Sequence, residues 1–127
     1  MRREFNLGPD DIRVLETLGC PWETIAQGGA RWLLLRQHPI PEGYNVAQAD
    51  VAIRLDAYPA GMIDMVYFSP PLSRADGKVI NNLSALSIDN RSFQQWSRHY
   101  PWRQGVDSLC THLRRVRAWL KNEFKKR

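Results

Sequence analysis

The sequence predicts an α+β fold, in which a helix near each end of the chain packs on an antiparallel β-sheet. Three observations support this fold class. A short segment near the N-terminus and a longer one near the C-terminus have apolar residues at helical spacing, and short alternating apolar segments lie between them, separated by glycines and prolines. A chain of 127 residues suits one domain, and we expect it to cover residues 1–127.

The first predicted element is a short helix that starts after Gly8. Pro9 suits the first helical position, where its missing N–H needs no partner, and Asp10 and Asp11 suit the positive end of the helix dipole. Apolar residues then recur on one face until Gly19, which is placed as the helix stop.

Four strands are expected to follow as an antiparallel meander. They cover residues 22–26, 31–36, 49–55 and 65–68. Gly28 and Gly29 favour a hairpin between the first two strands. Residues 38–43 should be irregular, because prolines fix φ and remove backbone donors. Residues 79–88 have the pattern of one more short strand, and residues 89–101 are expected to be a loop or a short helix.

The last predicted element is an amphipathic helix that starts at Val106. Its apolar stripe consists of Val106, Leu109, Cys110, Leu113, Val116, Leu120 and Phe124. Residues 114–127 also hold seven Lys and Arg residues against Glu123 alone. This basic end is either a solvated face or a docking patch for an acidic protein or nucleic acid, and the solvated face is the simpler interpretation.

Composition narrows the class of protein. Two cysteines cannot build a disulfide framework or, by themselves, a structural zinc site, and the three histidines have no metal-binding spacing. We therefore expect no metal and no cofactor. No secretory signal and no apolar run of membrane-spanning length is present, so we expect a cytoplasmic protein without a membrane partner.

Residues 92–102 hold the side chains best suited to chemistry. Ser97 and His99 lie two apart, so in an extended segment they share a side, as a nucleophile and its base would. Arg98 between them is suited to bind a carboxylate or phosphate. The rival nucleophiles are Ser84, Ser87 and Ser92. Alternatively, Ser97 caps a turn and His99 only binds a carbonyl.

The same segment is rich in aromatic residues. Trp96, Tyr100 and Trp102, flanked by arginines, have the composition of a stacking surface for single-stranded nucleic acid. Trp102 is better explained as an anchor of the last helix against the sheet. We therefore do not expect nucleic acid as a partner.

Two ordered motifs carry a family resemblance. In residues 44–72, a strand followed by Tyr58-Pro59 leads to a second strand that ends in Phe68-Ser-Pro-Pro. This order resembles the central meander of ubiquitin-conjugating (E2) enzymes, and Trp102 resembles the tryptophan before their next helix. The Trp-Ser-Arg-His cluster at 96–99, followed by Trp-Arg-x-Gly-Val-Asp, resembles more specifically the prokaryotic E2-like group called family E. The resemblance covers residues 9–121.

The resemblance implies an E2/UBC-like fold: an N-terminal helix, a four-stranded antiparallel meander, an irregular active-site segment and a C-terminal helix. It implies an E2-like transferase, an acyl carrier in a bacterial ubiquitin-like conjugation pathway. The carrier would accept the C-terminus of a ubiquitin-like protein from an E1-like adenylating protein. A deconjugating peptidase of the same pathway and a role in antiphage defence are further implications.

The chain departs from the E2 pattern at the site of the usual cysteine. Cys20 precedes the first strand, and Cys110 lies on the apolar face of the last helix, where a buried, inert thiol is expected. We therefore expect a serine oxyester on Ser97, with His99 as base and Asn82 (or Asn81) as oxyanion donor. The alternatives are a catalytically inactive E2 variant that binds a ubiquitin-like protein or an E1 partner, or a catalytic residue supplied by another chain.

Overall fold

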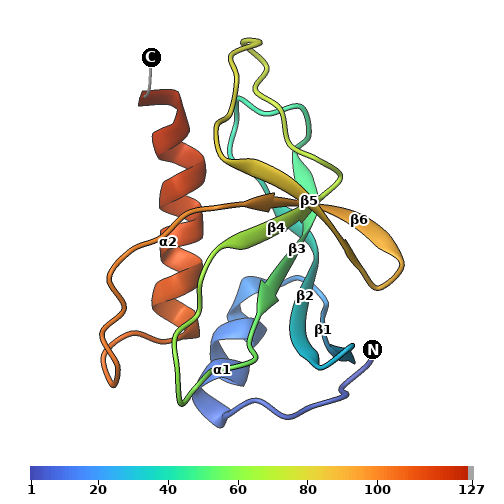
Figure 1. Ribbon diagram of the computed structural model, residues 1–127, viewed down its shortest axis with the longest axis vertical. Helices are drawn as coiled ribbons and strands as arrows, with labels where there is room; N and C mark the ends of the chain where they lie inside the picture. The colour runs from blue at the N-terminus through green and yellow to red at the C-terminus, as the bar shows by residue number, and fades with distance from the viewer. Residues whose placement is uncertain (126–127) are drawn as a thin grey trace.

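The computed structural model of the chain describes residues 1–125. In chain order, its elements are α1 (Pro9–Leu18), β1 (Trp22–Gln27), β2 (Ala30–Pro39), β3 (Gln48–Arg54), β4 (Val66–Ser69), β5 (Leu83–Ile88), β6 (Arg91–Trp96), α2 (Leu109–Asn122) and the 3₁₀ turn η1 (Glu123–Lys125). Figure 1 shows the two helices beside the sheet. The α+β class, the N-terminal helix and the C-terminal helix are thus confirmed. No helix within residues 1–125 is both long and apolar enough to span a bilayer.

The sheet has six antiparallel strands in the order β1-β2-β3-β4-β6-β5. The prediction of a four-stranded meander followed by an irregular segment is therefore wrong in its strand count. The first four strands do form a meander, but β4 then pairs with β6 instead of β5. The last two strands are a hairpin, which adds its second strand to the sheet and leaves its first strand at the edge.

The prediction of a loop or short helix over residues 89–101 missed β6. Its turn, Asp89-Asn90, has positive φ at both residues, as a tight hairpin turn requires. Asn and Asp tolerate this conformation, but the pair is a weaker signal than Asn-Gly. The strand itself is rich in glutamine. Gln94 is satisfied by tertiary hydrogen bonds, because its side-chain oxygen accepts from the backbone N–H of Leu72 and from the indole of Trp96.

Both helices cover the same face of the sheet. The core on that face joins Leu15 of α1 and Val116 of α2 to sheet residues such as Val51 and Phe68. Along β3, Val51 and Ile53 lie in this core and Ala52 between them lies in a second core on the opposite face, as the period of two along a strand requires. Trp96 at the end of β6 is fully buried in this core, so the strand that leads to the candidate site is firmly anchored.

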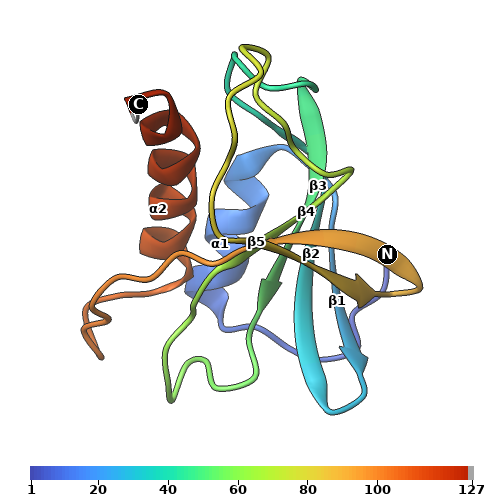
Figure 2. The ribbon, with the colours of Figure 1, turned by 45° about the horizontal axis from the view of Figure 1, so that its top comes forward.

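A second, smaller core lies on the opposite face of the sheet. It contains Trp32, Tyr67, Ile88 and Phe93, although no helix among residues 1–125 covers this face. The sheet curls instead, as the crossing of the β5–β6 hairpin over the other strands shows in Figure 2. The turn of this hairpin reaches the end of the edge strand β1. There the backbone N–H of Asp89 donates to the side-chain oxygen of Gln27 at 2.7 Å. The hairpin therefore closes the second core itself.

Of three boundary predictions, one is confirmed and two need adjustment. Gly19 does end α1 in the left-handed conformation, as predicted. The segment 38–43 is only partly irregular, since β2 continues through His38 and Pro39 beyond a register shift. The last helix starts at Leu109 and not at Val106, which is 60% exposed. Ser108 caps it: its side chain accepts from the backbone of Thr111, whose side chain accepts from the backbone of Ser108.

The basic face of α2 is exposed where the structure describes it, at Arg114, Arg117, Lys121 and Lys125. Lys126 and Arg127, which belong to the predicted basic end, lie outside the described residues. Whether this face is merely solvated or docks an acidic partner stays a prediction.

Candidate functional site

The structure places Ser97 directly after β6, half-buried, at the point where the β5–β6 hairpin leaves the sheet. Its backbone N–H donates to the carbonyl oxygen of Asn82 at 3.0 Å, which extends the hairpin pairing by one residue. Its hydroxyl oxygen accepts from the side-chain amide of Gln95 at 3.3 Å. The serine is thus held at the end of a regular strand pair, not in a free loop.

Asn82 lies opposite Ser97 in the hairpin, and its role as oxyanion donor stays a prediction. It is exposed and has a φ of 59°, an uncommon conformation for a residue other than glycine. The neighbouring Asn81 is also exposed, and its carbonyl oxygen accepts from the guanidinium of Arg98 at 3.1 Å. The hairpin therefore brings an amide side chain and a hydroxyl to adjacent positions.

His99 has a partner that sequence reasoning missed. Its Nδ1 lies 2.8 Å from one carboxylate oxygen of Asp64 and 3.0 Å from the other. The imidazole is 64% exposed and the carboxylate 27%, so Asp64 is the inner member of the pair. Within residues 1–125 no hydrogen bond joins His99 to Ser97. The structure therefore joins Ser97 to Asn82 and His99 to Asp64.

A second histidine, His112 of α2, lies near this pair and is fully buried. Its Nε2 lies 2.8 Å from the carbonyl oxygen of Met65, which can only accept, so Nε2 carries the proton. Burial lowers the pKa of His112 to about 4, although the hydrogen bond to Met65 opposes this shift. The ring is therefore neutral at physiological pH.

Arg98 and Trp96, which flank Ser97 in the sequence, have structural contacts. Arg98 packs over the ring of Trp96, and its side chain is only 10% exposed, with contacts to the Ser97 carbonyl and to Glu123. It is therefore not presented to a ligand in this arrangement. Trp96 is fully buried and cannot act as a stacking platform for a base. Trp102 packs against the core beside Tyr58, in agreement with its expected anchoring role.

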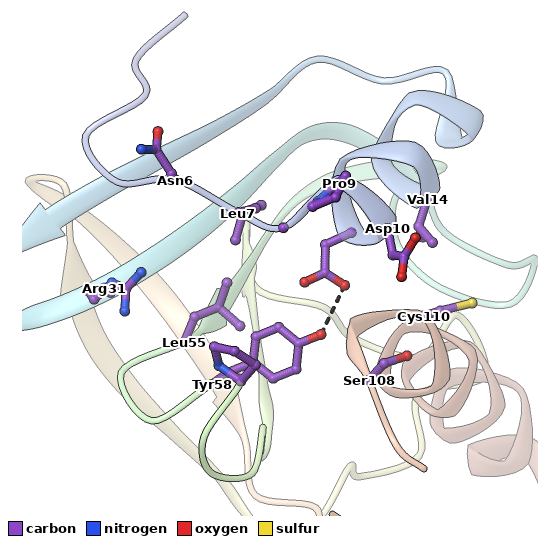
Figure 3. A pocket seen from close by; sticks show the side chains of 13 residues that line it. Asn6, Leu7, Pro9, Asp10, Val14, Arg31, Leu55, Tyr58, Ser108 and Cys110 are labelled. Carbon is purple, nitrogen blue, oxygen red and sulfur yellow. Dashed lines mark hydrogen bonds between the residues drawn. The ribbon is translucent and has the colours of Figure 1, made fainter. Parts of the chain in front are cut away.

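The two cysteines lie elsewhere. Cys20 is half-buried with its sulfur 4.0 Å from Nδ1 of His38, and burial raises the pKa of its thiol, which disfavours the reactive thiolate. Cys110 is half-buried at a cavity of about 330 Å³ between the start of α1, the Tyr58-Pro59 turn and the start of α2. Figure 3 shows this cavity and the hydrogen bond of 2.9 Å from the Tyr58 hydroxyl to Asp11. The cavity wall holds neither Ser97 nor His99.

The residue that the sequence could not reveal is Asp64, which lies 35 positions before His99. No local spacing connects them, and only the approach of the β3–β4 connection to the segment after β6 makes the pair. Among residues 1–125, no group of three or more His, Cys, Asp or Glu side chains is placed to hold a metal ion. The side chains that the site presents are a hydroxyl, an amide and a carboxylate-paired imidazole.

Comparison with known proteins identifies the class of the chain. The family model described as prokaryotic E2 family E matches residues 7–123. No curated protein and no solved structure gives a significant match. The match covers both helices and all six strands, including the segment that carries Ser97 and His99. The chain therefore belongs to prokaryotic E2 family E.

Proposed function

We propose that this domain is the acyl carrier of a bacterial ubiquitin-like conjugation pathway. Membership of prokaryotic E2 family E indicates a role in such a pathway and interaction with a ubiquitin-like protein and an E1-like protein in general. The observation that carries the more specific proposal is the exposed His99, paired with Asp64 close along the chain to Ser97. An enzyme that lacks the usual cysteine needs such a base to use a hydroxyl.

In the proposed step, the E1-like protein presents the C-terminal carbonyl of the ubiquitin-like protein as a thioester. The Ser97 oxygen attacks that carbonyl while its proton passes to Nε2 of His99. The Asn82 amide donates to the oxyanion of the tetrahedral intermediate, which then expels the E1 sulfur as a thiolate. The product is an oxyester on Ser97, from which an amine or hydroxyl of the target takes the acyl group. This step requires the His99 ring to approach Ser97.

The experiment combines the purified domain with an E1-like protein, ATP and the ubiquitin-like protein, followed by intact-protein mass spectrometry. We expect an adduct that survives thiol reductants and is cleaved by alkali, as an ester is. Ser97→Ala should abolish it. Ser92→Ala is the matched control, because Ser92 is an exposed serine of the same hairpin strand. An adduct that persists in Ser97→Ala would overturn the assignment of the nucleophile.

A second candidate function is a binding module that carries no acyl group. One observation favours it. The Ser97 hydroxyl oxygen accepts a hydrogen bond from the Gln95 amide, and no hydrogen bond within residues 1–125 connects it to His99. In that case the domain would bind the ubiquitin-like protein or the E1-like protein without any covalent adduct. Retained binding in a pull-down, with no adduct for the wild-type domain, would favour this function over the carrier.

The wider setting is also part of the proposal. In a bacterial ubiquitin-like conjugation pathway, we also expect a deconjugating peptidase that cleaves the product. We expect the pathway to contribute to antiphage defence. Co-expression of the domain with its genomic neighbours, followed by phage challenge, tests the second point. Loss of protection with Ser97→Ala, but not with Ser92→Ala, is the expected result.

A further inference from the structure

The Asp64–His99 pair has a defined protonation pattern. A carboxylate only accepts hydrogen bonds, so the proton between the two groups is carried by Nδ1 of His99. In the neutral ring this leaves the lone pair on Nε2, which has no hydrogen-bond partner within residues 1–125. Because the ring is 64% exposed, this nitrogen is accessible to a reacting group.

A backbone hydrogen bond holds the Asp64 carboxylate in place. The same carboxylate oxygen that contacts His99 at 3.0 Å also accepts the backbone N–H of Met65 at 3.0 Å. Met65 has a φ of 60°, a conformation that is uncommon for a residue that is neither glycine, Asn nor Asp. The strained residue therefore fixes the direction of the carboxylate.

The buried His112 contacts the residue that follows each member of the pair. Its Nε2–H donates to the carbonyl oxygen of Met65, the residue after Asp64. Its Nδ1, the acceptor of this tautomer, lies 3.3 Å from the hydroxyl of Tyr100, the residue after His99. One neutral imidazole in the core thus connects the two surface segments from below. This convergence is not explained by the packing of either segment alone.

We infer that Asp64 is a positioning residue, which holds His99 in the tautomer with the proton on Nδ1 and the lone pair on Nε2. His112 supports it through Met65 and Tyr100. The use of that lone pair as a base for Ser97 rests on the proposed function. When Nε2 takes the Ser97 proton, the imidazolium that forms is stabilised by the adjacent carboxylate, which itself stays ionised.

The first test needs no partner protein. Long-range proton–nitrogen NMR of the full chain, at a pH well above the usual histidine pKa of about 6.5, reports which nitrogen of His99 carries the proton. We expect Nδ1 in the wild-type protein and a loss of this preference in Asp64→Asn. Asp10→Asn, which removes an exposed carboxylate by the same chemical change, should leave the His99 signals unaltered. Protonation on Nε2 in the wild type, or no change in Asp64→Asn, would overturn the inference.

The second test measures the rate of adduct formation under the conditions of the carrier assay. Because general-base catalysis contributes about 10²–10⁴-fold, Asp64→Asn should slow the reaction by roughly that factor, with binding of the partners unchanged. Asp64→Glu, which keeps the carboxylate, should recover part of the rate. An unaltered rate in Asp64→Asn would refute a role for Asp64 in catalysis. If the wild type forms no adduct, the proposed function fails, and the tautomer measurement still decides the position of the proton.

Discussion

His112 has the most unusual environment of any titratable side chain near the site. It is fully buried, donates to Met65 and lies near Arg115, whose charge adds to the effect of burial on its pKa of about 4. The nearby Asp64 opposes this effect. A neutral imidazole satisfies two neighbours at once, one as donor and one as acceptor, which no aliphatic side chain could do. The residue therefore has a structural role, and it connects the segments that carry Asp64 and His99.

This environment predicts a pH-dependent stability. The unfolded chain binds a proton at His112 near pH 6.5, but the folded chain does so only near pH 4. The free energy of unfolding should therefore be unaffected above pH 6.5 and fall by about 1.4 kcal/mol per pH unit below it, to a total of about 3 kcal/mol. Urea unfolding at a series of pH values measures this slope.

His38 must be separated from His112 in that experiment. Burial and Arg117 also lower the pKa of His38, so it contributes with the same sign. His38→Gln should retain most of the slope, because His112 is the more deeply buried. Glu23, whose pKa is lowered to about 2 mainly by Arg2, loses its contribution only below pH 4.5. A flat stability curve between pH 6.5 and 5 in His38→Gln would contradict the assignment to His112.

At the scale of elements, the end of α2 is joined to the β2–β3 connection by close packing. The Tyr44 hydroxyl donates to the carbonyl oxygen of Leu120 at 2.6 Å, and the Tyr44 ring lies 5.0 Å from Phe124 of η1. Gly43 lies against Phe124 with a φ of 107°, so both backbone and space require glycine there. This contact fixes the C-terminal end of α2 against the sheet.

Gly43→Ala is therefore expected to destabilise the protein by two mechanisms. The backbone conformation alone costs about 1–2 kcal/mol, and a Cβ atom 2.8 Å from Cε1 of Phe124 adds about 1–3 kcal/mol of overpacking. Gly77→Ala is the matched control, because Gly77 also has a positive φ (77°) but nothing within 4 Å of the added atom. Thermal or urea unfolding should show the larger loss for Gly43→Ala, and equal losses would argue against the steric contribution.

At the scale of the whole molecule, a network of charges closes the curled sheet. Arg2 donates to both carboxylate oxygens of Asp89 at 2.8 and 2.6 Å and to Glu23 at 2.8 Å. Arg36 bridges Glu23 to Asp50, and Asp50 also binds Arg91. The network connects the N-terminal segment, the strands β1, β2, β3 and β6, and the turn of the β5–β6 hairpin. Ser97 follows the last strand of that hairpin. A loss of the network should therefore increase the mobility of the segment that carries Ser97.

Arg2→Ala should loosen this closure. Because the Arg2 side chain is 39% exposed, we expect a loss of only about 1 kcal/mol, and a smaller loss at high salt. Hydrogen exchange of the β5–β6 amides should speed up, while that of β2 and β3 should not. Arg13→Ala, which removes an exposed pair with Asp10, should leave the hairpin unchanged. Equal exchange of the hairpin amides in Arg2→Ala and the wild type would show that the network does not hold the hairpin.

The elements with local signals could be predicted from the sequence alone. Pro9 and Gly19 mark the ends of α1, the glycine pair marks the β1–β2 hairpin, and the apolar stripe marks most of α2. The motifs around Tyr58-Pro59 and Trp102 were sufficient to indicate an E2-like chain, and the family match agrees. These features depend on backbone conformation and on periodicity, which a few neighbouring residues fix.

The remaining features depend on contacts between distant parts of the chain. β6 is a strand because β4 offers it a partner and Leu72 satisfies Gln94, neither of which is encoded in residues 91–96 alone. His99 acquires its carboxylate from a residue 35 positions earlier, through a strained backbone that the buried His112 supports. Long-range contacts of this kind depend on the free energy of the whole packed chain. For that reason the sequence could identify Ser97, His99 and Asn82 as candidates, but not which of them lie together.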